Sequence, residues 1–155
     1  MKLQISLALL LGASSLFANE SLITKAKNAG LEAIPSNKQV LMKLIDDPKD
    51  PITDSKVELG KKLYFDPRLS RSNLISCNTC HNLALGGADG VPAAIGHGWT
   101  ANPHHLNSPT VYNSVFFKAQ FWDGRSPHLA DQAAGPIQAG PEMAAPPALV
   151  VERIN

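Results

Sequence analysis

The stretch Ser76-Cys77-Asn78-Thr79-Cys80-His81 holds the only two cysteines of the chain and reads C-x-x-C-H. Cysteines three positions apart lie on one face of a helical turn, so both thiols can reach the two vinyl groups of one haem and form thioethers. The histidine directly after the second cysteine then falls under the iron. The motif therefore predicts covalent attachment of a c-type haem through Cys77 and Cys80, with His81 as an axial ligand.

A cysteine pair has three other common uses: a zinc site, a redox pair and a disulfide. A structural zinc needs four tetrahedral ligands, and one C-x-x-C with scattered histidines is a poor zinc-finger spacing. A thioredoxin-like redox pair needs a strand-helix-strand context, whereas the flanking sequence is rich in Gly, Pro and Asn. A plain disulfide remains open but leaves His81 without a role. Haem is the interpretation that these residues favour.

The N-terminus has the three regions of a secretory signal. Lys2 supplies the charge, Ile5 to Leu11 is an apolar run, and small residues follow up to Ala18. The apolar run is too short to span a bilayer. We therefore expect a signal peptide over residues 1–18, cleaved after Ala18, and a periplasmic location for residues 19–155. Export agrees with the haem motif, since bacteria attach c-type haem outside the cytoplasmic membrane.

Composition restricts the remaining possibilities. The 155 residues suit one domain at most, and only 6% of them are aromatic, so the protein core is modest and a haem would add apolar bulk. Pro 12 and Gly 11 indicate long irregular segments. Without residues 1–18 the chain loses one positive charge, Lys2, and is formally neutral. Nothing in this charge pattern indicates nucleic-acid binding.

Periodicity predicts short helices separated by loops. We expect a weak helix over Ser21 to Ala33, interrupted by Gly30, and a second helix that starts with a capping box at Ser36 and ends before Asp47-Pro48. Asp54 is expected to cap a third helix that runs to Phe65. A short helix is predicted from Leu129 to Ala134, followed by a loop from Gly135 to Pro147.

Two polar residues in glycine- or proline-rich loops are candidates for chemistry at a haem. His97 lies between Gly96 and Gly98, so it has little local packing and can swing toward or away from an iron. His104 and His105 compete with it for that role. Glu142 lies in the loop after Gly135, where a carboxylate is usually solvated, but above a haem it would be the acid-base group that peroxide chemistry requires.

Several ordered motifs from Val57 to Met143 resemble the bacterial di-haem cytochrome c peroxidase family, which includes the maturation enzyme of methylamine dehydrogenase. The matching stretches, in chain order, are Leu59–Ser70 (LGKKLYFDPRLS), Cys77–Gly90 (CNTCHNLALGGADG), Asn107–Thr110 (NSPT), Phe121–Arg125 (FWDGR), Gly135–Ile137 (GPI) and Glu142–Met143 (EM). The resemblance implies an all-α, cytochrome c-like haem domain with long irregular loops. A second such domain, with a second haem, follows it in the family.

The resemblance also implies roles for individual residues. Cys77 and Cys80 hold the haem, His81 is its proximal ligand and His97 matches the detachable distal ligand. Gln132 and Glu142 match the residues of the peroxide pocket. Trp122 matches the tryptophan between the two haems, and Asn107 matches a ligand of the calcium at the domain interface, an ion that prefers oxygen donors.

The chain departs from the family pattern in one respect, because no second C-x-x-C-H follows. We therefore expect residues 19–155 to be the N-terminal haem portion of a longer gene product, with the second haem domain missing. The function expected is cytochrome c peroxidase activity: reduction of hydrogen peroxide to water with electrons from a small periplasmic c-type cytochrome. The resemblance also implies a homodimer, the form that the family commonly adopts. The alternatives are a di-haem oxidase of the methylamine dehydrogenase maturation type and a c-type electron-transfer protein without peroxidase activity.

Overall fold

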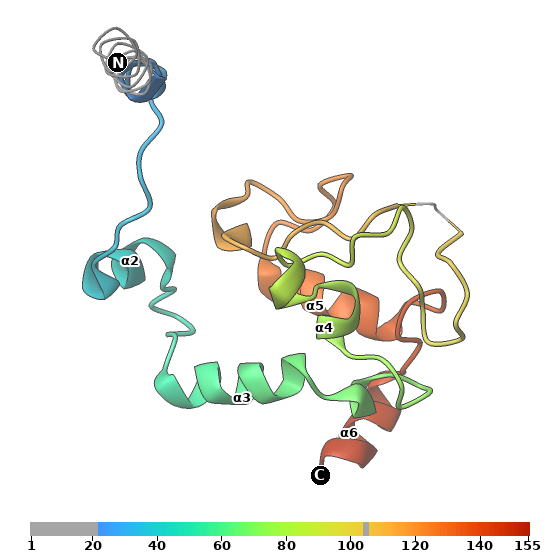
Figure 1. Cartoon of the computed structure of the whole chain (residues 1–155). Coiled ribbons are helices and arrows are strands. Elements are labelled where there is room, and N and C mark those ends of the chain that lie inside the picture. Colours follow the sequence, from blue (N-terminus) through green and yellow to red (C-terminus); the bar gives the residue numbers. More distant parts are fainter. Residues whose placement is uncertain (1–21, 104–105) are drawn as a thin grey trace, which may run out of the picture. The chain divides into compact units, whose positions relative to one another are not determined.

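The structure is a computed structural model, and it describes residues 22–103 and 106–155 (Figure 1). The expected signal peptide and the candidates His104 and His105 lie outside the described residues. Within these residues the regular structure is helical: the chain forms isolated β-bridges but no extended strand. This agrees with the all-α class predicted from the sequence. None of the helices described has the length and apolar character needed to cross a membrane.

The chain divides after Leu44 into two compact units. In the first unit, residues 22–28 are helical and the helix ends in a turn at Gly30, whose φ is +78°. The sequence predicted an interruption at Gly30, but the helix does not resume after it, so the expected continuation to Ala33 was wrong. Helix α2, Lys38–Ile45, begins one residue later than expected, because the N-cap is Asn37 and not Ser36. The Asn37 Oδ1 atom accepts hydrogen bonds from the N–H groups of Gln39 (2.9 Å) and Val40 (3.1 Å).

The second unit, Ile45–Asn155, contains the haem motif and begins with the longest helix described, α3, Asp54–Tyr64. The N-cap of α3 is Thr53, whose Oγ1 accepts from the N–H of Lys56 at 3.2 Å. The prediction that Asp54 is the cap was therefore wrong by one residue. Asp54 lies instead in the first turn, where a carboxylate interacts favourably with the helix dipole.

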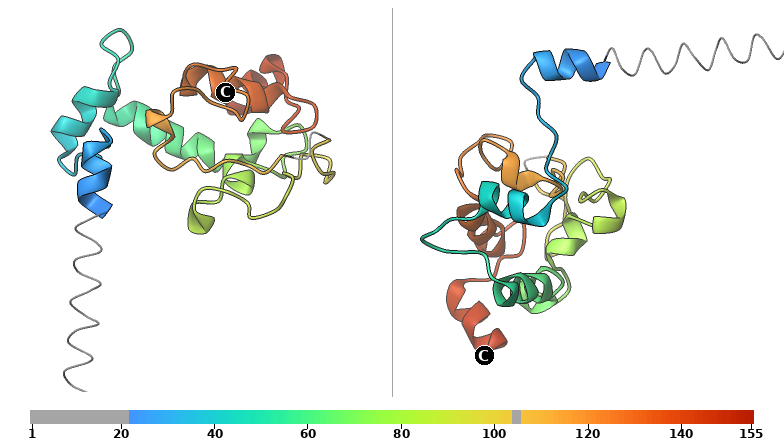
Figure 2. Two further views of the ribbon diagram at one scale, coloured as in Figure 1. Left: turned by 90° about the horizontal axis from the view of Figure 1, so that it is seen from above. Right: turned by 90° about the vertical axis from the view of Figure 1, so that its left-hand side faces the viewer.

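Short elements follow α3 and are joined by irregular chain. In order they are the 3₁₀ turn η1 (Pro67–Leu69), the one-turn helix α4 (Cys77–Cys80), the 3₁₀ turns η2 (Leu83–Leu85) and η3 (Ser114–Phe116), and the helices α5 (Leu129–Gln138) and α6 (Pro147–Ile154). Figure 2 shows how much of the yellow and orange part of the chain runs as loop and not as helix. The long irregular loops were predicted from the Gly and Pro content.

Helix α5 is longer than predicted and includes Pro136. A proline removes one helical hydrogen bond and usually ends a helix. Here the returning chain holds the last turn in place: the carbonyls of Pro136 and Ile137 accept from the N–H groups of Met143 (3.1 Å) and Ala145 (2.7 Å). The expectation of a loop directly after Ala134 was therefore wrong, because contacts with a later segment determine where this helix ends.

The hydrophobic core of the second unit is small and lies where α3, the haem motif and the C-terminal segment meet. Its buried members are Leu69, Ile75 and Met143, and Leu63, Ile137 and Val150 pack against them. Helix α6, for which the sequence analysis made no prediction, contributes Val150 to this cluster. The core thus holds the turn before α4 against the chain that follows α5.

Candidate functional site

Helix α4 presents the two cysteines on a single turn, as their spacing predicted. The Ser76 N–H donates to Thr79 Oγ1 (2.9 Å), and the His81 N–H donates to the Cys77 carbonyl (2.9 Å), which closes the turn. Both thiols are free and half-buried, so the disulfide alternative is not the arrangement found. The two sulfur atoms and the imidazole of His81 therefore belong to one local unit.

The surroundings of the thiols suit covalent attachment better than metal ligation. Burial raises the pKa of Cys77. The pKa of Cys80 is raised to about 11, first by burial and then by the negative charges of Asp89 and Glu142. A structural zinc site needs four ligands, and Cys77 and Cys80 supply two. In the part of the chain that the structure describes, no three His, Cys, Asp or Glu residues are grouped to hold a metal ion.

The imidazole of His81 is already oriented by a hydrogen bond on one of its two nitrogens. Its Nδ1 lies 3.0 Å from the carbonyl oxygen of Pro109, so Nδ1 carries the proton and donates. The lone pair then resides on Nε2, which is the arrangement that metal-ligating histidines adopt. Two free thiols on one turn and a histidine with Nε2 as its acceptor fit a c-type haem.

The main chain of His81 has a partner of its own. The hydroxyl of Tyr64, the last residue of α3, donates to the His81 carbonyl. The pKa of Tyr64 is raised to about 12, chiefly by burial, so the hydroxyl stays protonated and remains a donor. Neither Tyr64 nor Pro109 was singled out as a site residue in the sequence analysis. The sequence does not indicate which main-chain carbonyl will accept a hydrogen bond. A tyrosine at an apolar position of a helix is interpreted as a core residue.

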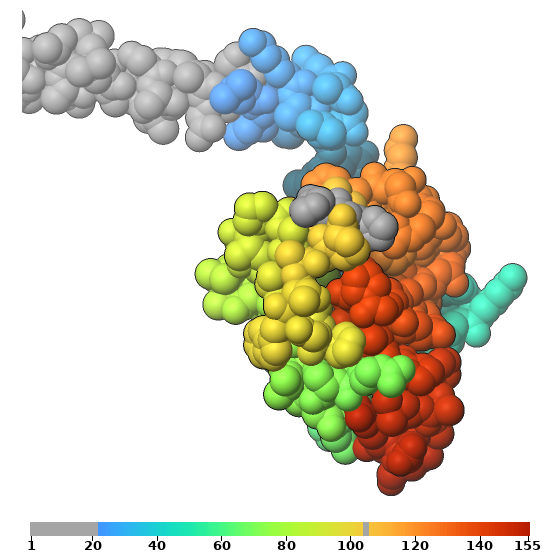
Figure 3. Space-filling model, turned by 90° about the vertical axis from the view of Figure 1, so that its right-hand side faces the viewer, coloured from blue at the N-terminus to red at the C-terminus, as the bar shows by residue number. Residues whose placement is uncertain are grey.

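The loop that carries His97 is joined directly to the loop that carries Glu142. The His97 N–H donates to the Glu142 carbonyl at 2.8 Å. Gly96 permits this approach, because a Cβ added there would overlap the carbonyl group of Pro141. Figure 3 shows the yellow segment with His97 lying against the red segment that follows α5. The structure thus brings together the two loop residues that the sequence analysis singled out separately.

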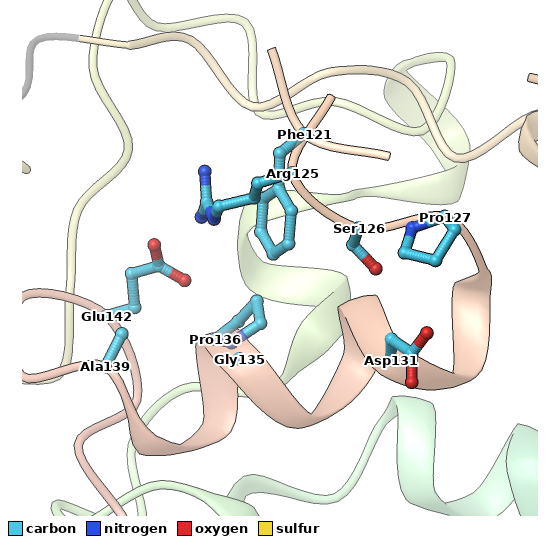
Figure 4. A pocket seen from close by; sticks show the side chains of 9 residues that line it. All are labelled: Phe121, Arg125, Ser126, Pro127, Asp131, Gly135, Pro136, Ala139 and Glu142. Atoms are coloured by element: carbon cyan, nitrogen blue, oxygen red, sulfur yellow. The ribbon is translucent and has the colours of Figure 1, made fainter. Parts of the chain in front are cut away.

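Glu142 lines an open pocket of about 480 Å³ that extends along α5 (Figure 4). The other lining residues are Phe121, Arg125, Ser126, Pro127, Asp131, Gly135, Pro136 and Ala139. The Arg125 guanidinium stacks on the Phe121 ring at 3.4 Å and pairs with Asp123 at 2.9 Å. In Figure 4 the Arg125 guanidinium and the Glu142 carboxylate point toward one another. The sequence near Glu142 offers no basic residue, and only the fold brings Arg125 to this pocket.

The remaining candidates occupy two other places. Trp122 is 65% exposed, and its Nε1 donates to the main-chain carbonyl of Asn107 at 2.8 Å. The Asn107 amide donates to Asp89 Oδ1 (3.4 Å) and to the Val91 carbonyl. Gln132 lies on α5, half-buried, and is not among the residues that line the pocket of Glu142. The structure therefore joins Trp122 to Asn107, whereas Gln132 is not brought into the pocket with Glu142.

Comparison with known proteins gives a consistent result. Residues 54–155 match the family model described as di-haem cytochrome c peroxidase. The chain is 59% identical over 105 residues to cytochrome c551 peroxidase of Pseudomonas aeruginosa, covering 68% of this chain and 30% of that protein. It is 48% identical over 112 residues to the methylamine utilization protein MauG of Methylorubrum extorquens, covering 72% of this chain and 31% of that protein.

Solved structures agree with these sequence matches. A MauG-like protein associated with microbial copper homeostasis superposes with a TM-score of 0.63 at 27% identity, over 70% of this chain and 32% of that one. The diheme peroxidase BthA from Burkholderia thailandensis gives a TM-score of 0.56 at 26% identity, with the same coverage. The chain spans about a third of the length of the relatives that it matches.

Proposed function

This chain belongs to the di-haem cytochrome c peroxidase family, and from that membership we propose that it is the haem-bearing N-terminal portion of an enzyme that reduces hydrogen peroxide to water. Residues 54–155 match the family, and relatives at 59% and 52% identity are named as cytochrome c peroxidases. The electrons would come from a small periplasmic c-type cytochrome or a similar donor.

The observation that carries the proposal is the hydrogen bond from the His97 N–H to the Glu142 carbonyl. A carrier of electrons needs two permanent axial ligands and no acid-base group beside them. A peroxidase whose resting haem has two axial ligands needs one ligand that can leave, and it needs an acid-base group within reach of the bound peroxide. The His97 loop and the Glu142 loop, joined through their main chains, bring a histidine and a carboxylate into neighbouring segments, which supports the second requirement.

A c-type haem would be held by thioethers to Cys77 and Cys80 and by Nε2 of His81, with His97 as the second, detachable ligand. The haem would supply the redox centre that passes the donor's electrons to peroxide. The chain's own contribution begins at His81, where the Pro109 carbonyl accepts the Nδ1 proton and so keeps Nε2 available.

Glu142 is proposed as the acid-base residue. Its carboxylate takes a proton from one oxygen of hydrogen peroxide and returns it to the other, so that the O–O bond breaks with water as the leaving group. Two electrons and two protons taken up from outside convert the peroxide into two water molecules. Gln132 is assigned the orientation of the substrate, and Trp122 lies on the proposed electron route from the second haem. Both assignments rest on the family motif.

We propose further that residues 1–18 direct export and that the enzyme works in the periplasm. Asn107 would contribute to a calcium site, together with oxygen donors from elsewhere, since calcium takes 6 to 8 oxygen ligands. A second haem and homodimer formation are expected on the same family grounds.

One second function has a specific observation in its favour. The chain is 48% identical to a MauG protein, so an oxidase of the methylamine dehydrogenase maturation type is the alternative. A detachable histidine is not needed for that chemistry, and the presence of His97 is the reason to prefer a peroxidase.

The test uses the full gene product that contains this chain, loaded with c-type haem and reduced at its high-potential haem. We expect peroxide-dependent oxidation of a reduced small c-type cytochrome, followed by the absorbance of the donor. Glu142→Gln should lower kcat by about 10²–10⁴-fold, the usual contribution of a positioned acid-base group. Glu152→Gln, at an exposed site on α6, is the matched control and should retain the rate.

Two results would contradict the proposal. Absence of donor oxidation in a fully haem-loaded protein would exclude peroxidase activity. An unchanged kcat for Glu142→Gln would remove Glu142 from the mechanism. A pyridine haemochrome spectrum, measured on each sample, shows that c-type haem is present and so separates loss of haem from loss of catalysis.

A further inference from the structure

The helix that carries the haem motif has little hydrogen bonding of its own. Helix α4 is a single turn of four residues, and the His81 N–H to Cys77 carbonyl bond closes it. His81 itself leaves the helix with φ −122° and ψ 56°. Carbonyls at the end of a helix have no helical donor and need another partner. The orientation of His81 therefore depends on contacts from other segments.

Two distant segments supply those contacts. On the main chain, the Tyr64 hydroxyl donates to the His81 carbonyl, 17 residues away in sequence. On the ring, Nδ1 is held by the Pro109 carbonyl, 28 residues away. Tyr64 is half-buried at the end of α3, and its ring meets the ring of Phe65 edge-on with centroids 5.3 Å apart. A side chain placed by a regular helix thus fixes the backbone of the candidate iron ligand.

We infer that Tyr64 is a positioning residue for the haem: by holding the His81 carbonyl, it sets the plane of the imidazole that ligates the iron. The inference rests on the proposed function in one respect, that His81 is a haem ligand. If the hydroxyl is removed, the partly buried carbonyl turns toward another donor, because leaving it unsatisfied is costly. The imidazole, attached to the same backbone, then rotates relative to the second axial ligand.

The chain contains a built-in control. Its second and last tyrosine, Tyr112, donates its hydroxyl to the Leu83 carbonyl, two residues beyond His81. Both bonds join a tyrosine hydroxyl to a main-chain carbonyl, but Leu83 is not a candidate iron ligand. If Tyr64 only stabilises the loop, the two tyrosine substitutions should have similar effects on the haem iron. A role in positioning the ligand predicts an effect of Tyr64 alone on the iron.

The experiment compares the haem-loaded chain of residues 19–155 with its Tyr64→Phe and Tyr112→Phe variants by electron paramagnetic resonance of the low-spin ferric haem. The g values of a haem with two imidazole ligands depend on the angle between the ring planes. We expect Tyr64→Phe to shift or broaden the largest g value and Tyr112→Phe to leave it unchanged. If the resting haem is high-spin, added imidazole supplies the second ligand and the comparison is made in that form.

A second measurement covers the case in which Tyr64→Phe does not take up haem. In the Tyr112→Phe background Tyr64 is the one tyrosine left, so growth on 3-fluorotyrosine labels it alone with a stronger donor of nearly the same shape. A shift of the largest g value supports the inference.

Unaltered g values in both experiments, or an equal shift for Tyr112→Phe, would overturn it. The two outcomes are separable. If Tyr64→Phe shifts the largest g value as expected but the full gene product does not turn over peroxide, the proposed function is contradicted and the role of Tyr64 stands.

Discussion

Gly96 shows how one residue determines whether the two candidate loops meet. A Cβ at this position would lie 2.8 Å from the carbonyl carbon of Pro141 and 3.1 Å from the carbonyl oxygen of Glu142. Real Cβ atoms do not approach backbone so closely, so the His97 loop must move away. The hydrogen bond from His97 to Glu142 is the contact that such a movement breaks.

Gly96→Ala is therefore expected to lower the free energy of unfolding by about 1–3 kcal/mol, the usual cost of overpacking. Urea unfolding of the haem-loaded chain, followed by circular dichroism, measures it. Gly60→Ala is the matched control, since nothing lies within 4 Å of the added Cβ and the position is inside α3. That variant should gain about 0.5–1 kcal/mol. Equal effects of the two substitutions would show that the contact with Pro141 does not form.

At the scale of elements, the side chain of Arg153 connects α6 to the turn before the haem motif. The Arg153 guanidinium donates to the main-chain carbonyls of Arg68 (3.3 Å), Arg71 (3.1 Å) and Ser70. Arg68 returns one bond, from Nη1 to the Arg153 carbonyl at 3.1 Å. The planar fork of an arginine suits such a set of acceptors, which a lysine cannot serve at once. The C-terminal helix thereby stabilises the η1 turn, from which the chain enters α4.

Arg153→Gln should lower the free energy of unfolding by about 1–3 kcal/mol, because it leaves partly buried carbonyls without a donor. Amide hydrogen exchange is expected to speed up at η1 and α6 and to change little in α3. Glu152→Gln, next to it and exposed, should stay within about 0.5 kcal/mol of the parent chain. Unchanged exchange at η1 in Arg153→Gln would mean that the arginine does not connect the two elements.

At the scale of the whole molecule, few hydrophobic residues are buried for a chain of this size. In the part of the chain that the structure describes, the buried hydrophobic residues are Leu69, Ile75, Met143, Ala144 and Ala145. A small core supplies only a modest part of the stability of a domain. A haem attached through Cys77 and Cys80, as proposed, would add apolar surface to this core.

We therefore expect the haem-loaded chain to be more stable than the haem-free chain by several kcal/mol, on the order of what burial of one or two large apolar side chains supplies. Thermal unfolding of the two forms, followed at a helix-sensitive wavelength, measures the difference. The variant Cys77→Ser with Cys80→Ser, which cannot form thioethers, should behave like the haem-free chain. Identical midpoints for haem-loaded and haem-free protein would show that the haem contributes nothing to the fold.

The local part of the site could be predicted from the sequence. The spacing of Cys77, Cys80 and His81 within one turn is a property of neighbouring residues, so the pattern predicts it directly. The same holds for α2 and α3, whose caps were misplaced by a single residue. The sequence does not distinguish Asn37 from Ser36 or Thr53 from Asp54, because Ser, Asp, Asn and Thr are all good N-cap residues and the local backbone conformation decides between neighbours.

The remaining part was decided by tertiary structure, and the reason is the same at each position. Helix α5 continues through Pro136 because Met143 and Ala145 return to bond its last carbonyls. Arg125 faces Glu142 because the loop after Phe121 folds back along α5. The partners of His81 and His97 are main-chain carbonyls far away in sequence, at Pro109 and Glu142. Every residue type except proline offers the same carbonyl and N–H groups, so only the packing of the loops determines which of them meet.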